Sequence, residues 1–219
     1  MTRTYWAAVT AVVLALLFAA GAVTVAVGNG NDDASGTPRT PAVDSADAGF
    51  ARDMSVHHQQ AVEMSFIVRD RTKDEEVRRL AYDIANTQAN QRGMMLGWLD
   101  LWELPKVSSD EPMAWMASGE SGRSAHGTHK ARDGSLMPGM ATSAELAKLG
   151  RVDGKQAEIL YLQLMTDHHK GGVTMAQGCA DRCEVGTERL LAQGMVDAQQ
   201  SEIGLMADLL KARGAAPRP

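Results

Sequence analysis

The chain has 219 residues, of which 44% are hydrophobic, and its formal net charge is -5 at pH 7. A chain of this size can bury one sizeable core, so a single folded domain is expected. It has no basic run, which argues against nucleic acid as a partner, because phosphate binding needs clustered Lys and Arg. Methionine is abundant, with 13 residues against three Phe and three Tyr. Since methionine also fills cores, its positions must decide what it does.

Residues 1–28 are predicted to be a signal peptide or a membrane anchor. The stretch from Trp6 to Val27 carries no charge and is about long enough to cross a bilayer as a helix. Arg3 precedes it and Asp32 follows it, and this charge bias directs the rest of the chain outward. We favour an uncleaved anchor, because the stretch is longer than the apolar region of a typical signal peptide. With either outcome the functional part is expected to be extracytoplasmic.

Residues 29–45 are polar and contain Gly and Pro, which predicts a flexible linker. The folded domain is expected over residues 46–213, with a first repeat at 46–104, a loop at 105–141 and a second repeat at 142–213. No segment has the pattern of a strand. A short helix is predicted from a capping box at Thr142 to Glu145 as far as Leu149. Four long helices are expected at Ala46–Asp70, Asp74–Trp102, Asp153–Gln177 and Thr187–Arg213.

An 11-residue motif occurs twice, as MSVHHQQAVEM and MTDHHKGGVTM, and both copies read M-x-x-H-H-x-x-x-x-x-M. The copies begin at Met54 and Met165, an offset of 165 − 54 = 111 residues. The helices that follow keep this offset, for example at Gln88 and Gln199. Matching gaps across two helices indicate a duplicated helical hairpin whose copies hide their apolar faces by pairing. The predicted fold class is therefore all-α, a four-helix bundle built from this hairpin.

The histidines and methionines of each motif are predicted to lie on the inward face of their helix. At about 100° per residue, both histidines and both methionines of a copy fall within an arc of about 120°. Glu63 lies on the opposite side, as a solvated residue should. The facing helices carry inward stripes of Gln and Met, with Glu202 as their only acid. The centre of the bundle is thus expected to hold His, Met and Gln.

Two interpretations of this inward face remain open. A buried His is usually a hydrogen-bonded core residue, and Met at helical spacing usually packs. Four His in two matched pairs favour a metal instead, because burying four imidazoles is costly unless something satisfies them. Thioether sulfur suits Cu(I) and imidazole accepts copper or zinc, whereas di-iron bundles use carboxylates from all four helices. We therefore favour copper, as Cu(I), with zinc or iron less expected.

The sequence contains the segments GFARDMSVHHQQAVEMS, MPGMATSAELAKL, LYLQLMTDHHKGGVTMA and LAQGMVDAQQSEIGLMADLL. Over about Gly49 to Ala212 it resembles the bacterial domain-of-unknown-function 305 family. The resemblance implies an exported protein with a ferritin-like four-helix fold, and some members of the family are linked to copper binding and tolerance. By that resemblance the metal ligands would be Met54, His57, His58, Met64, Met165, His168, His169 and Met175.

Two places depart from the pattern of the family. Gly171 and Gly172, in the second copy of the motif, are expected to loosen the third long helix. Gln91 stands where we would expect a Glu, as at the matching position Glu202. Both departures bear on how a metal would be coordinated.

The loop between the repeats carries further spaced pairs of His and Met. As a mobile segment outside the bundle, it could capture metal and pass it inward. The alternative is a disordered linker in which MPGM simply starts the short helix. The residues of this possible secondary metal site are Met113, Met116, His126, His129, Met137 and Met140.

Cys179 and Cys183 have no counterpart in the first copy of the repeat. In an oxidising compartment a disulfide is the plainer interpretation, and it would close the turn between the third and fourth long helices. As thiolates, the two residues would instead be good ligands of Cu(I).

These features predict an extracytoplasmic copper-binding protein that acts in copper sequestration, tolerance or delivery. It would be held at the membrane by its N-terminal helix or secreted, with copper ions as its ligand and a protein partner that the sequence does not identify. One alternative is a metal-dependent redox enzyme of ferritin-like type, which the scarcity of inward carboxylates disfavours. Another is a metal-free interaction module of the cell surface, whose His and Met only form a core.

Overall fold

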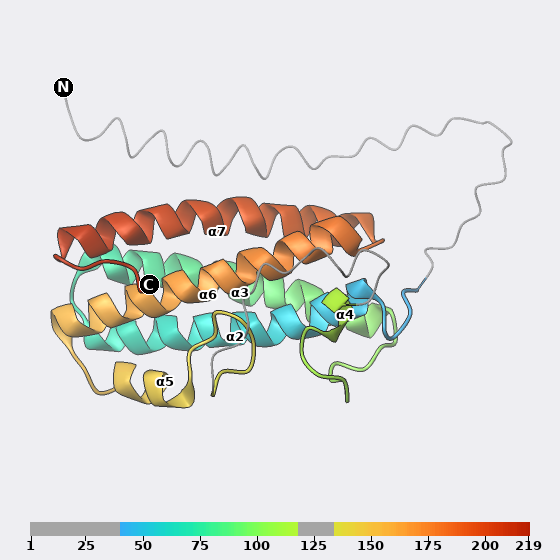
Figure 1. Cartoon of the computed structure of the whole chain (residues 1–219), viewed down its shortest axis with the longest axis horizontal. Helices are drawn as coiled ribbons and strands as arrows, with labels where there is room; N and C mark the ends of the chain where they lie inside the picture. The colour runs from blue at the N-terminus through green and yellow to red at the C-terminus, as the bar shows by residue number, and fades with distance from the viewer. Residues whose placement is uncertain (1–39, 118–133) are drawn as a thin grey trace, which may run out of the picture. The chain divides into compact units, whose positions relative to one another are not determined.

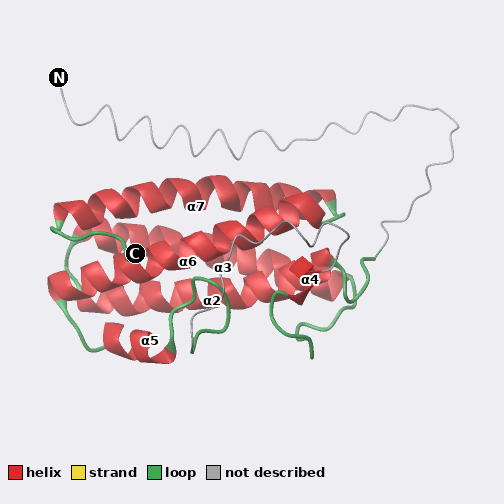
Figure 2. Cartoon of the chain, viewed as in Figure 1, coloured by secondary structure: helices red, strands yellow, loops and turns green. Residues whose placement is uncertain are grey.

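The computed structural model describes residues 40–117 and 134–219. Within these residues the chain is all-α, with six helices and no strand (Figure 2). In the same two segments, no helix is both long and apolar enough to span a membrane. The predicted anchor over residues 1–28 and most of the predicted linker lie outside the described residues.

Five of the six described helices lie where the sequence predicts a helix. The long helices are α2 (Ala46–Arg71), α3 (Glu75–Leu101), α6 (Gly154–Arg182) and α7 (Gly186–Ala212), and the short ones are α4 (Ala114–Ala117) and α5 (Ser143–Leu149). α6 continues to Arg182, beyond the predicted end at Gln177. The prediction is wrong at α4, which lies in a segment expected to be irregular. Its four residues are too few to show a helical period.

Side-chain caps fix where several helices begin. Ser45 accepts a hydrogen bond from the first turn of α2, and Asp74 accepts two from the first turn of α3. Thr142 and Glu145 form the predicted capping box of α5, each side chain accepting from the backbone N–H of the other. These bonds satisfy N–H groups that the first turn of a helix leaves without a partner.

The four long helices form two hairpins that pack together (Figure 1). α2 packs against α3, α6 packs against α7, and the contact between α2 and α6 joins the hairpins. Met54 and Met175 share one cluster of buried side chains, and Met64 and Met165 share the other. The start of α2 therefore meets the end of α6, and the end of α2 meets the start of α6. α2 and α6 thus run in opposite directions.

The loop before α5 crosses α6 with its backbone almost touching the helix. A Cβ on Gly171 would lie 2.1 Å from the Pro138 carbonyl oxygen, and one on Gly139 would lie 2.3 Å from the Asp167 carbonyl oxygen. Gly139 also has φ +77°, which favours glycine. Gly172 leaves room for Gln199, whose Oε1 would be 2.4 Å from a Cβ. The expectation that these glycines loosen the third long helix is wrong, since α6 is continuous and they let the loop and α7 approach.

Asp47, in the first turn of α2, holds the turn between α6 and α7. Its carboxylate accepts hydrogen bonds from the backbone N–H groups of Glu184 at 3.2 Å and Val185 at 2.7 Å. Glu188, in the first turn of α7, is fully buried. Burial first, and then the charge and hydrogen bonding of Asp47, raise the pKa of Glu188 to about 9. Glu188 is therefore protonated at neutral pH.

The pKa of Glu188 predicts a pH-dependent stability. Its carboxyl keeps a proton in the folded state up to about pH 9, whereas the unfolded chain releases it above its ordinary value of 4.5. The free energy of unfolding should therefore fall between these pH values, by up to about 1.4 kcal/mol per pH unit. Glu188→Gln keeps the size and a donor, so it should remove this slope and stabilise the protein at pH 8. Urea unfolding of both proteins at pH 5 and pH 8 measures the difference, and equal slopes would contradict the assignment.

The loop crossing predicts opposite effects for two glycine substitutions. Gly171→Ala should lower the free energy of unfolding by about 1–3 kcal/mol, because a methyl group pushes the loop off α6. Gly93→Ala is the matched control, since Gly93 is exposed within α3 and its Cβ would meet nothing within 4 Å. This control should stabilise the helix by up to about 1 kcal/mol. Denaturant unfolding measures both, and similar effects of the two substitutions would argue against the close crossing.

Candidate metal centre

The four motif histidines lie together at the contact between α2 and α6. His57 and His58 on α2, and His168 and His169 on α6, are all 0% exposed. The rings of His57 and His168 lie against each other, with centroids 3.8 Å apart and planes at 33°. The ring of His169 has its centroid 6.3 Å from that of His168. The prediction that both histidine pairs face inward is confirmed.

Each imidazole donates a hydrogen bond from Nε2 to an oxygen atom. The acceptors are Pro138 O for His57 at 3.3 Å, Gln91 Oε1 for His58 at 2.8 Å, His57 O for His168 at 2.9 Å and Glu202 Oε2 for His169 at 2.6 Å. Carbonyl, amide and carboxylate oxygens only accept, so the proton of each bond must come from the histidine. This places a proton on Nε2 in all four rings and leaves Nδ1 as the atom with the free lone pair.

The Nδ1 atoms of all four histidines are buried without a hydrogen-bond partner. A buried acceptor without a donor costs free energy, of the order of 1–3 kcal/mol for each group. In a metal site, by contrast, one ring nitrogen binds the ion while the other donates to a carbonyl or carboxylate oxygen. The four histidines already make the second of these two interactions, and their Nδ1 atoms remain available for the first.

Burial keeps the imidazoles of His57, His58 and His168 neutral. It is the largest cause that lowers the pKa of His57 to about 3 and of His58 to about 4. The pKa of His168 lies well below its ordinary value, because of burial and then the neighbouring histidines. Metal binding requires the neutral imidazole, so these rings are in the ligating form at pH 7.

The histidine nitrogens alone do not form a compact ligand set. Across residues 40–117 and 134–219, one group of three His, Cys, Asp or Glu residues has its ligand atoms within 4.8 Å of one another, and it consists of Cys179, Cys183 and Glu188. A metal between α2 and α6 would therefore need thioether sulfur, or a small rotation of the rings, to complete its coordination.

The four motif methionines are fully buried, on two different sides of the histidines. Met54 and Met175 lie in one core cluster, and Met64 and Met165 lie in the other. All four are 0% exposed. The structure therefore brings them together in two pairs rather than around one point.

The methionines predicted for a mobile loop outside the bundle belong to the core instead. Met137 and Met140 are 1% and 5% exposed and lie in the same cluster as Met54 and Met175. Met113 and Met116 pack against this cluster and are partly buried. His126 and His129, the remaining residues of this predicted secondary site, lie outside the described residues. The loop methionines are buried rather than mobile because their apolar thioether side chains are stabilised by packing on a methionine-rich core.

Two polar side chains that the sequence did not assign to the site hold the outer histidines. Gln91 on α3 bonds to His58, and Glu202 on α7 bonds to His169, at matching positions since 91 + 111 = 202. They line a small cavity of about 10 Å³ between α3 and α7, together with Gln88 and Gln199. A cavity of this volume has room for about one water molecule or ion. In each repeat the polar residue follows the outer histidine by 33 positions, and this equal spacing was the sequence signal that could have found both pairs.

The Oε1 atoms of Gln88 and Gln199 are also buried without a hydrogen-bond partner. The side chain of Glu202 is 26% exposed, so this small cavity has one carboxylate that reaches solvent. The cavity between α3 and α7 is thus lined by side-chain oxygen atoms and lies between the outer histidines and the surface.

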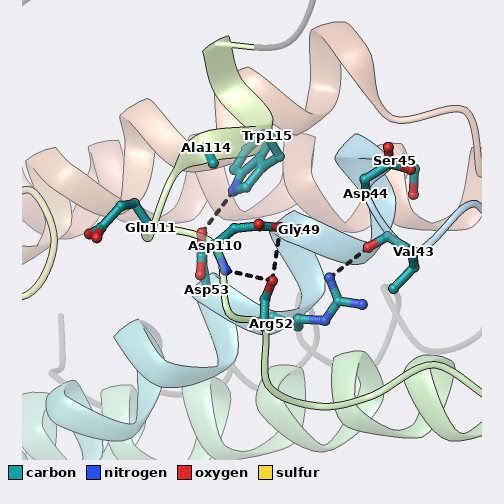
Figure 3. Close-up of a pocket in the computed structure, with 11 residues that line it drawn as sticks. Val43, Asp44, Ser45, Gly49, Arg52, Asp53, Asp110, Glu111, Ala114 and Trp115 are labelled. Carbon is teal, nitrogen blue, oxygen red and sulfur yellow. Dashed lines mark hydrogen bonds between the residues drawn. The ribbon is translucent and has the colours of Figure 1, made fainter.

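A larger pocket, of about 200 Å³, lies between α2 and α4. Figure 3 shows Asp53 beside Trp115, and this carboxylate accepts from Trp115 Nε1 at 3.0 Å and from the Met113 N–H at 2.7 Å. Arg52 donates to the Val43 carbonyl in the same pocket. Its lining, all within the described residues, contains no His, Cys or Met. The pocket is therefore separate from the histidines, and its hydrogen bonds hold α4 on α2.

Cys179 and Cys183 form a disulfide at the end of α6, with Cα atoms 4.8 Å apart. Cys179 is in the last turn of the helix, and Cys183 is its C-cap residue. Because the helix ends between them, the backbone can bring the two sulfur atoms together.

The comparisons with known proteins agree with this architecture. Among solved structures, a predicted secreted DUF305 protein from Streptomyces coelicolor is 68% identical, with a TM-score of 0.72, and the match covers 81% of this chain and 99% of that one. A DUF305 fragment from Deinococcus radiodurans is 28% identical, with a TM-score of 0.62, covering 76% and 96%. CopM in its Cu(I)-bound form shares the fold at 19% identity and a TM-score of 0.55, covering 76% and 96%.

None of the curated proteins matches the sequence. The model of the family described as Domain of unknown function (DUF305) matches residues 47–210, from the first turn of α2 to near the end of α7. The chain therefore belongs to the DUF305 family.

Proposed function

We propose that this protein binds copper, as Cu(I), in a buried centre between α2 and α6. The observation that carries the proposal is the set of four buried histidines that donate from Nε2 and keep Nδ1 without a partner. A bound cation would satisfy these lone pairs, and the Nε2 bonds would limit how far each ring turns to reach it. The Nδ1 atoms of His57, His58, His168 and His169 are the proposed nitrogen ligands.

The surrounding side chains favour a soft ion. Met54 and Met175 on one side, and Met64 and Met165 on the other, are the proposed thioether ligands, and thioether sulfur suits Cu(I). The carboxylate of Glu202 already accepts a hydrogen bond from His169. A hard ion such as Mg²⁺ prefers several oxygen ligands, and zinc or iron would gain less from the sulfur atoms.

Binding is favoured over catalysis because the centre is closed. The four imidazoles and the four motif methionines are 0% exposed, so a substrate larger than an ion has no path to them. Glu202 is partly exposed and bonds to His169, so it is suited to guide an ion between solvent and the centre. We infer copper sequestration, tolerance or delivery rather than a redox reaction on a substrate.

The comparisons support this proposal at the level of the fold. CopM has been solved with Cu(I) and with Cu(II) bound, and it shares the fold of this chain. The match to a predicted secreted protein supports a location outside the cytoplasm. We propose further that residues 1–28 act as an anchor or signal, and that the ferritin-like bundle over residues 46–213 arose by duplication of one hairpin. The matched bonds of His58 with Gln91 and of His169 with Glu202 support the duplication.

Removing the histidines tests the centre. Replacement of His57, His58, His168 and His169 by Ala should abolish most high-affinity Cu(I) binding while the helical content survives. Competition with a chelating dye measures the affinity, and circular dichroism measures the helical content. Gln59→Ala is the matched control, because Gln59 is exposed next to the first histidine pair. Unchanged affinity in the fourfold variant would exclude the histidines as ligands.

Replacing the methionines tests the oxidation state. Leu in place of Met54, Met64, Met165 and Met175 keeps about the same volume, and each such change usually costs under about 1.5 kcal/mol of stability. This variant should lose affinity for Cu(I) by a much larger factor than for Cu(II), since Cu(II) prefers nitrogen and oxygen ligands. Met94→Leu, at a position that is 48% exposed, is the control. Retention of both affinities would show that these methionines only pack the core.

A further inference from the structure

A second group of ligand atoms lies at the end of α6, and none of the hydrogen bonds of the four histidine Nε2 atoms involves it. The sulfur atoms of Cys179 and Cys183 and a carboxyl oxygen of Glu188 all lie within 4.8 Å of one another. These residues are 0%, 3% and 0% exposed. Because the two sulfur atoms are bonded to each other, a single ion could contact all three atoms only after that bond is broken.

Glu188 is fully buried in this group, and its polar neighbour there is the carboxylate of Asp47. Neither of its carboxyl oxygens accepts a hydrogen bond from a described donor. The nearby carboxylate of Asp47 is itself occupied, since it accepts from the N–H groups of Glu184 and Val185. Burial makes the charged form of this acid costly, and a cation bound to its oxygen would stabilise the carboxylate.

The surroundings of this group favour a soft cation. Met195 of α7 lies in the same buried cluster as the two cysteines. The end of α6 also presents carbonyl groups and the negative end of the helix dipole, and both stabilise a cation. Thiolates and thioethers together select ions such as Cu(I) or Ag(I).

We propose that Cys179, Cys183 and Glu188 form a second metal site, which opens when the disulfide is reduced and then binds one soft monovalent cation. In the disulfide form the sulfur atoms are bonded to each other and cannot act as thiolates. The site is independent of the histidine centre, because none of its three ligands belongs to the M-x-x-H-H motifs.

The opening step is an exchange with a dithiol. The dithiol supplies two electrons and two protons, the Cys179–Cys183 bond breaks, and the dithiol becomes a disulfide. When the cation binds, the two cysteine thiols and the carboxyl group of Glu188 release their three protons to solvent, and the cation bonds to both sulfur atoms and to a carboxylate oxygen of Glu188. The dithiol can reach the bond by fraying of one turn, because Cys183 is the C-cap of α6 and its neighbour Glu184 is exposed.

Ag(I) binding to the full chain tests the proposal, since Ag(I) does not oxidise thiols. The protein is used either oxidised or reduced with dithiothreitol and desalted without oxygen. The reduced protein should bind one more equivalent of Ag(I) than the oxidised protein, and that ion should protect both cysteines from alkylation by iodoacetamide. Metal analysis and mass spectrometry give the two readouts. Equal Ag(I) content in both forms, or unprotected cysteines, would overturn the proposal.

Three variants complete the test. Cys179→Ser with Cys183→Ser should show no gain of Ag(I) after treatment with dithiothreitol. The fourfold histidine variant should keep the gain, so a failure of the histidine centre is distinguished from a failure of this site. Glu188→Gln should keep the extra equivalent but bind it at least about tenfold more weakly. Unchanged affinity in Glu188→Gln would exclude its carboxyl group as a ligand.

The proposal can be tested even if reduction of the disulfide unfolds part of the protein. Circular dichroism of the reduced protein reports its helical content before and after one equivalent of Ag(I) is added. If reduction loosens the end of α6, Ag(I) should restore the helical signal and the protection of both cysteines together. Failure of Ag(I) to restore either signal would count against the site.

Discussion

The contact between α2 and α6 depends on the burial of four imidazole rings. In water each ring satisfies both of its nitrogen atoms, whereas here each ring keeps one hydrogen bond through Nε2 and none through Nδ1. Buried polar atoms without partners are few in folded proteins, and each normally has a specific reason. Four of them at one contact between helices lower the stability of the apoprotein, and the apolar clusters on both sides must offset that cost.

The remaining elements of the structure position the acceptors of these four bonds. The loop before α5 brings the Pro138 carbonyl to His57, and it can do so because Gly139 and Gly171 let two backbones come close. α3 contributes Gln91 and α7 contributes Glu202. Each hairpin thus supplies a histidine pair and the partner of its outer ring, whereas the inner rings depend on the loop and on the contact between the hairpins.

The side chains of α6 change in chemical character along one helix. Its middle carries two imidazoles, Met175 follows, and the helix ends at the disulfide of Cys179 and Cys183. Sulfur therefore becomes more frequent toward the end of the helix, where methionines of α2, α3, α7 and the loop join the same cluster. The covalent bond keeps the two cysteine sulfur atoms out of this chemistry in the oxidised protein.

The sequence by itself determined the five helices that have a clear period or cap, and the inward face on which His and Met lie. These are local properties, because helical period and capping act within a few residues. The repeat of 111 residues also indicated that the two hairpins match. Only the tertiary structure decided which ring nitrogen carries the proton, how the methionines divide into two clusters, and that Met137 and Met140 are buried. These properties depend on the register and direction of packed helices and on the path of a loop, which residue spacing within one helix does not specify.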